Sequence, residues 1–104
     1  MMAFPLDVPR LQESFSLQAK GSKGAVVELA VELTPGETVI YRWEADEEVE
    51  FNIHSHQGDA VTYHERLSQR EADGVFGSRT PGDYYLMWEN GHSRPIPVRV
   101  ELRR

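Results

Sequence analysis

The strongest constraint on the fold is a run of alternating apolar and polar residues at positions 27–33. Apolar residues occupy every odd position of this run, and Glu28, Ala30 and Glu32 stand between them. A period of two puts alternate side chains on opposite faces of a strand, so the run predicts a strand with one buried face. No segment of the chain has a helical period to compete with it. The sequence therefore predicts an all-β protein.

Other short segments have the same character, and turn signals separate them. Pro35-Gly36 and Pro81-Gly82 have the chemistry of type II turns. The acidic run at 44–48 is predicted to be a solvated loop, and the polar run at 67–73 a loop or a single helical turn. Strands are expected near residues 15–17 and at 27–33, 38–43, 50–56, 60–66, 74–79, 84–90 and 97–102. Seven to eight short strands at this spacing predict an antiparallel β-sandwich of jelly-roll type.

The length of 104 residues allows one domain and no second core. Pro5 and Pro9 punctuate the start of the chain, so residues 1–20 are expected to form an N-terminal arm, either irregular or supplying a first strand. Residues 21–104 are expected to form the single sandwich domain.

Composition excludes several classes of function. The chain has no cysteine, which rules out disulfides, thiolate metal sites and cysteine nucleophiles. Its net charge of -6 argues against a nucleic-acid partner. No apolar run approaches the roughly twenty residues that a membrane helix needs. An unidentified protein partner and a homodimer joined through open sheet edges both stay open.

The first residues lack the basic start and continuous apolar run of a signal peptide. As written, the sequence therefore predicts a cytoplasmic protein. The alternative is a periplasmic or extracellular protein from which a signal peptide has been removed.

Four segments in order resemble the Golgi-dynamics (GOLD) domain. They are Leu-Thr-Pro-Gly-Glu at 33–37 followed by Tyr-Arg-Trp at 41–43, Val-Glu-Phe-Asn-Ile at 49–53, and Pro-Gly-Asp-Tyr-Tyr-Leu-Met-Trp-Glu-Asn at 81–90. The resemblance covers residues 25–102 and implies a compact β-sandwich that acts as an interaction module, with no catalytic residues to transfer. The chain lacks the cysteine pair of the eukaryotic cargo receptors, so it is expected to be a stand-alone bacterial relative.

Three histidines on one predicted hairpin form the main candidate site. His54 and His56 lie two apart on one strand and so share a face. If Ser55 pairs with Val61, Ile53 with Tyr63 and Asn52 with His64, the turn has an odd number of residues. Val61 and Tyr63 then point inward, and all three histidines point outward.

Three imidazoles on one face suit a divalent transition metal, and zinc, copper(II) or nickel are the expected ions. The candidate ligands are His54, His56 and His64, with Asp59, Glu50 or His92 as a fourth. The plainer interpretation is that these are polar residues on an exposed sheet face. A surface whose charge changes near neutral pH is a third interpretation.

We therefore expect a small non-enzymatic binding module that binds a divalent transition metal through its histidines. The alternative is a protein-interaction or structural sandwich without metal, in which sheet edges or the face of Tyr85 and Met87 mediate association. A small cupin-like metalloenzyme comes third, because the glutamate expected after the second histidine is replaced by Ala60 and Val61. Catalytic and cofactor-binding residues are not assigned.

Overall fold

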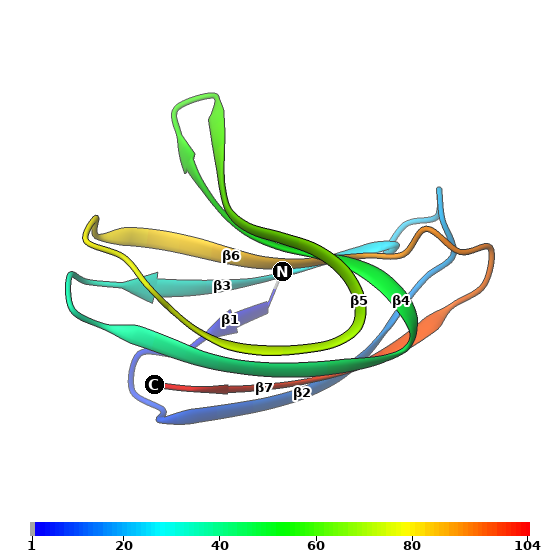
Figure 1. Cartoon of the computed structure of the whole chain (residues 1–104), viewed down its shortest axis with the longest axis horizontal. Coiled ribbons are helices and arrows are strands. Elements are labelled where there is room, and N and C mark those ends of the chain that lie inside the picture. The colour runs from blue at the N-terminus through cyan, green and yellow to red at the C-terminus, as the bar shows by residue number, and fades with distance from the viewer. Residues whose placement is uncertain (1) are drawn as a thin grey trace.

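Seven strands make up the part of the chain that the computed structural model describes, residues 2–104 (Figure 1). They are β1 (Met2–Phe4), β2 (Arg10–Leu17), β3 (Val26–Leu33), β4 (Thr38–Gln57), β5 (Ala60–Gly77), β6 (Gly82–Glu89) and β7 (Ile96–Arg103). The strand order is β1-β3-β6-β4-β7-β2, and β5 pairs along β4. The all-β class is confirmed. The strictly antiparallel sandwich is wrong, because β1 and β3 pair in parallel and the single mixed sheet curls until it is nearly a barrel. No helix long and apolar enough to cross a membrane occurs among these residues.

The curled sheet has two halves, which we call its layers: β7 and β2 lie in one, and β6, β3 and β1 lie in the other. The long strand β4 belongs to both layers. Its first half pairs with β7 over residues 40–45, and its second half pairs with β6 over residues 50–54. Between the two halves, residues 45–48 bulge opposite the single residue Arg70 of β5, whose guanidinium donates a hydrogen bond to the carbonyl of Asp46. A bulge bends the strand and increases its twist, which lets one strand turn from one layer into the other.

Two predicted loops are therefore wrong. The acidic run at 44–48 lies inside β4, and the polar run at 67–73 lies inside β5. Each run still turns apolar residues toward the core: Ala45 is buried, and Leu67 and Ala72 pack against the core. The backbone pairing between the two strands resumes on both sides of the bulge, and it keeps these residues extended.

Aromatic side chains fill the space between the layers. Phe51 packs against Trp43 and Trp88, with ring centroids 5.2 and 5.3 Å apart. On β6 the alternate residues Tyr84, Leu86 and Trp88 all point inward and are buried. Burying large aromatic rings supplies much of the hydrophobic free energy of a domain this small.

Asn90 closes one end of the fold. Its side chain is 1% exposed, and its amide group donates to the carbonyls of Leu17, Gln18 and Arg94. Its side-chain oxygen accepts a hydrogen bond from the backbone N–H of His92. One buried amide thus ties the end of β2 to the β6–β7 loop and satisfies backbone groups that would otherwise be unpaired.

The N-terminal residues supply two strands to the same sheet. β2 pairs with β7 over its full length, and Phe4 of β1 is buried in the core. The guanidinium of Arg104 donates to the carbonyls of Phe4 and Glu32, so it holds β1 beside β3.

Gly74 provides a test of how tightly the β4–β5 ribbon packs. A Cβ at this position would lie 2.6 Å from the Tyr41 hydroxyl oxygen and 2.8 Å from Cζ. That hydroxyl donates to Glu65, and burial followed by this hydrogen bond raises the pKa of Tyr41, which keeps the phenol protonated. We expect Gly74→Ala to lower the free energy of unfolding by roughly 1–3 kcal/mol, because the buried ring must move. Urea denaturation measures the change.

Gly91→Ala is the matched control, since nothing lies within 4 Å of a Cβ at that position and its φ is not positive. It should leave the urea midpoint unchanged. Equal midpoints for the Gly74 variant and the wild type would show that the ribbon is looser than the structure describes.

Candidate functional site

The hairpin that joins β4 to β5 has a different register from the one predicted. His56 pairs with Val61, and Gln57 pairs with Ala60, so the turn contains only Gly58 and Asp59. Gly58 has a φ of +61°, while Asp59 has a negative φ, which fits a type II′ turn. The predicted odd-length turn is wrong because a two-residue turn of this kind matches the twist of its flanking strands.

A bulge just below the turn shifts the register by one residue. Ile53 pairs with Glu65 and His54 pairs with Tyr63, so His64 is the extra residue of β5. Because side chains alternate across a strand, one extra residue exchanges the two faces beyond it.

The exchange separates the histidines that were predicted to share a face. His64 accompanies Ser55, whose hydroxyl lies 2.8 Å from His64 Nε2, and its ring packs beside Phe76 and Tyr84 on the inner side. Tyr63 and Val61 were predicted to point inward, but they are 47% and 43% exposed. The sequence-based assignment of these faces is therefore wrong for Val61, Tyr63 and His64 of β5. On β4, His54 lies on the face opposite Ile53, but it is buried and not exposed.

His54 and His56 instead meet two tyrosines on the outer face, and we call His54, His56, Tyr63 and Tyr85 the imidazole–tyrosine face. His54 lies between two cross-strand neighbours, Tyr63 on β5 and Tyr85 on β6. Its ring stacks on Tyr85 with centroids 5.4 Å apart and planes at 22°. The ring of His56 lies edge-on to the rings of His54 and Tyr85, with centroid distances of 5.1 and 5.3 Å. The hairpin that joins β4 to β5 projects from the body of the molecule as a two-stranded arm (Figure 1).

His54 is the most constrained member of this face. It is 4% exposed, and its Nδ1 lies 2.7 Å from the Asn52 side-chain oxygen. An amide oxygen can only accept, so Nδ1 carries a proton, and in the neutral imidazole Nε2 then keeps its lone pair. Nε2 lies 3.9 Å from a carboxylate oxygen of Glu28 on β3. Burial lowers the pKa of His54, and the nearby Glu28 carboxylate opposes that shift.

The other predicted ligands lie elsewhere. His92 Nε2 is 2.6 Å from the carbonyl oxygen of Glu48, so that nitrogen donates a hydrogen bond. Asp59 occupies the exposed turn, and Glu50 pairs with Glu89 farther down β4. Among residues 2–104, no three His, Asp or Glu side chains already stand close enough together to hold one ion.

Sequence reasoning missed several members of the site. Asn52 and Glu28 were not assigned to the histidines, although each contacts His54. Tyr85 was named only with Met87 as a face for association, although it is the cross-strand neighbour of His54. Nothing in the sequence indicated that Glu28 lies near the histidines, because its strand β3 does not pair with β4 and is separated from it by β6.

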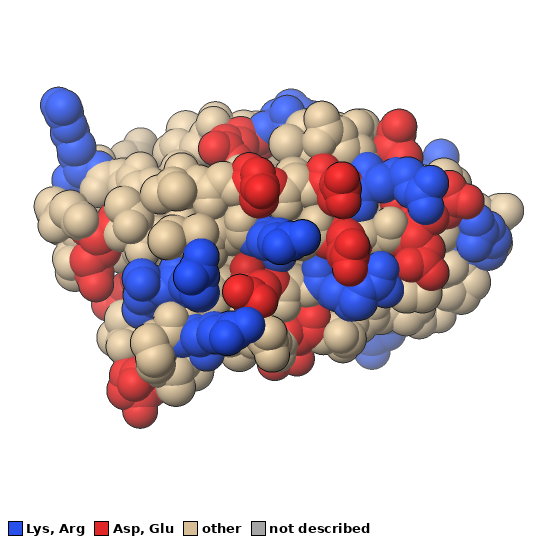
Figure 2. Space-filling view, turned by 60° about the horizontal axis from the view of Figure 1, so that its bottom comes forward, with Lys and Arg blue, Asp and Glu red and all other residues tan. Residues whose placement is uncertain are grey.

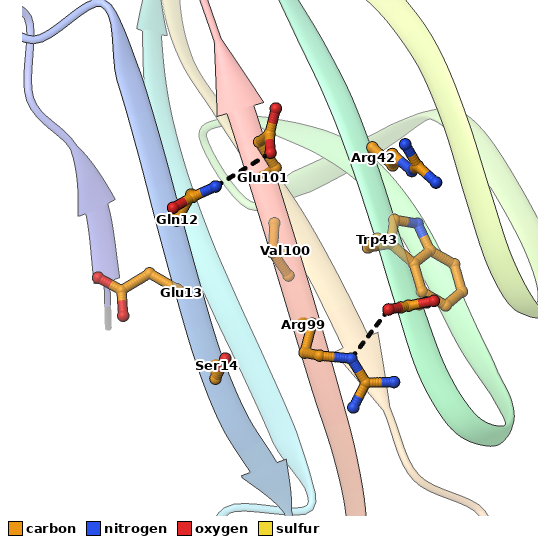
Figure 3. Close-up of a pocket in the computed structure, with 9 residues that line it drawn as sticks. Gln12, Glu13, Ser14, Arg42, Trp43, Arg99, Val100 and Glu101 are labelled. Atoms are coloured by element: carbon orange, nitrogen blue, oxygen red, sulfur yellow. Dashed lines mark hydrogen bonds and ion pairs between the residues drawn. The ribbon is translucent and has the colours of Figure 1, made fainter.

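A second region, a shallow hollow of about 380 Å³ across β2, β7 and β4, is lined by polar side chains (Figure 3). Some of its charged groups are already paired: Arg99 donates to Glu44 at 3.0 Å, and Glu101 accepts a hydrogen bond from Gln12 at 3.2 Å. Figure 2 shows the same mixture more widely, with acidic and basic side chains interspersed over one face. Exposed pairs such as these bind a further ligand only by exchanging partners, so the hollow is a weaker candidate than the imidazole–tyrosine face.

No family model and no curated protein matches this sequence. Among solved structures, the chain is similar to the pre-peptidase C-terminal domain of a collagenase from Bacillus anthracis, with a TM-score of 0.68 and 12% identity over 91% of this chain and 90% of that one. It is also similar to PliG of Aeromonas hydrophila, a periplasmic inhibitor of g-type lysozyme. That match has a TM-score of 0.59 and 10% identity over 98% of this chain and 93% of that one. At such identities the likeness shows a shared β-fold alone, and the GOLD resemblance stays a prediction.

The buried His54 makes stability depend on pH. Its pKa is lowered in the folded chain, while an unfolded histidine titrates near about 6.5. The unfolded state therefore binds a proton first as the pH falls through that value, and the free energy of unfolding decreases there. We expect urea denaturation to show a larger loss of stability between pH 7.5 and 5.5 for the wild type than for His54→Gln. Equal losses would contradict a buried neutral imidazole.

Proposed function

We propose that this chain is a non-enzymatic binding domain whose recognition surface is the imidazole–tyrosine face, and that its ligand there is a divalent transition metal ion. One observation carries the proposal. His54 is held by Asn52 so that Nε2 keeps its lone pair, and that lone pair stands 3.9 Å from the Glu28 carboxylate. Two acceptors facing each other without a shared proton repel, and a cation between them removes the repulsion.

The chemistry of the two groups supports such an ion. Metal-ligating histidines commonly donate their second ring N–H to an oxygen, as His54 does to Asn52. Burial lowers the pKa of His54, so the imidazole is neutral at physiological pH, as a ligand must be. A nitrogen and an oxygen that each bind an ion at about 2.0–2.1 Å stand between 3 and about 4 Å apart.

His56 is the third ligand in this proposal. Its side chain is exposed, and its ring already lies 5.1 Å from that of His54. Exposed side chains change rotamer within nanoseconds, so His56 can turn toward an ion held by the other two groups. Imidazole nitrogens with one carboxylate suit zinc, copper(II) or nickel.

Calorimetric titration of protein purified without an affinity tag tests the proposal. We expect one zinc, copper(II) or nickel ion to bind with a dissociation constant at or below about 1 µM. His54→Gln should weaken binding at least about tenfold, the effect expected for the loss of one ligand or its support.

His64→Gln is the matched control, because His64 lies on the other side of the arm with Ser55 and Tyr84. Its affinity should equal that of the wild type. Absence of binding by the wild type, or a loss caused by His64→Gln and not by His54→Gln, would overturn the metal as ligand.

A protein partner is the second candidate ligand, and the projecting arm favours it. Val61 and Tyr63 are among the most exposed large apolar residues of the chain, and Arg66 stacks 4.4 Å above the Tyr63 ring. Tyrosine and arginine are enriched where protein interfaces form. The similar lysozyme inhibitor is, by its description, a protein that acts on another protein. If this chain binds no metal ion but still binds a partner protein through the arm, this second candidate is the correct one.

A further inference from the structure

The nearly closed sheet leaves an open seam on the side opposite β4. The two ends of the strand order, β1 and β2, do not pair with each other, and the free edge of β2 runs for eight residues without a neighbour among residues 2–104. A cavity of about 580 Å³ lies in this seam, lined by Met2, Phe15, Val26, Val27 and Glu28.

The floor of the seam is apolar and leads to the core. Phe15 of β2 is half-buried, and its ring packs edge-on against Trp88 with centroids 5.5 Å apart. Across the seam, Val26 of β3 is 43% exposed. A free strand edge beside apolar side chains is the arrangement that accepts an added strand, because the edge supplies hydrogen bonds and the floor receives alternate side chains.

The carboxylate of Glu13 limits which added strands can pair with the free edge of β2. Glu13 lies between Leu11 and Phe15 on the inward side of β2, and within residues 2–104 no cation pairs with it. An inward-pointing charge on an edge strand discourages pairing with a purely apolar strand. A basic side chain opposite Glu13 would remove that obstacle by cross-strand pairing of opposite charges.

We propose that the free edge of β2 binds an extended segment of a partner protein, with apolar side chains toward Phe15 and Val27 and one basic side chain opposite Glu13. The added strand continues the β2–β7 ladder across the seam and closes the barrel. This site and the proposed metal site have one residue in common, Glu28, which lines the cavity and faces His54.

A designed peptide serves as the probe, with the sequence Val-Thr-Val-Thr-Lys-Thr-Val and blocked ends. Paired antiparallel to β2, it presents valines to Leu17, Phe15 and Leu11 and its lysine to Glu13. Titration into the ¹⁵N-labelled chain should give saturable shifts at the amides of residues 10–17, 26 and 27. The amides around His54 should not shift, which separates this result from any metal binding there.

Two changes to the probe and one to the protein complete the test. A peptide with glutamate in place of lysine should bind roughly fivefold more weakly or worse. Glu13→Lys should reverse that preference, and a peptide N-methylated on the edge-facing amides should not bind. Shifts centred on another strand, equal binding of the N-methylated peptide, or no saturable shift up to about 1 mM would overturn the proposal.

Discussion

The rest of the structure depends on β4, because this single strand pairs with β7 in its first half and with β6 in its second. The bulge at residues 45–48 lets it turn between the layers, and the aromatic core packs into the bend around Phe51. β5 follows β4 through both layers, so the ribbon they form ends in a hairpin that projects beyond the sheet (Figure 1). The backbone pairing of β4 with β5 thus connects the projecting arm to the part of the ribbon that packs on the core.

A second bulge, at His64, determines which side chains this arm presents on each face. With it, His54 and His56 lie beside Tyr63 and Tyr85 on one face, while His64, which is exposed, lies beside Ser55 and Tyr84 on the other. The outer set contains a buried, neutral imidazole whose free nitrogen faces a carboxylate, which is the basis of the proposed metal site. Both proposed interactions use parts of the chain that the nearly closed sheet does not cover. The metal site lies at the projecting hairpin, and the added strand would pair with the free edge of β2.

Much of the fold could be predicted from alternation and turn chemistry. The Pro35-Gly36 turn forms as expected, with Gly36 at a φ of +90° and a 3.0 Å hydrogen bond from Glu37 N to Thr34 O. Interior positions of β3 and β6 were assigned correctly because apolar residues there alternate without interruption. Polar segments inside β4 and β5 were missed because backbone pairing keeps them extended, and composition carries no sign of it. The prediction of which side chains share a face of the arm was wrong for a related reason. A one-residue bulge has no signature in the residue types, yet it moves every side chain beyond it to the opposite face.

Proton–proton NOEs between aromatic side chains test the central claim, that the bulge at His64 sorts the histidines onto opposite faces. The structure predicts NOEs from the His54 ring to Tyr63 and Tyr85, and from the His64 ring to Phe76 and Tyr84, all with centroids within 6.0 Å. NOEs joining the rings of His54 and His64, with none from His64 to Tyr84, would contradict it. That result would restore the unbulged hairpin and the three-histidine face.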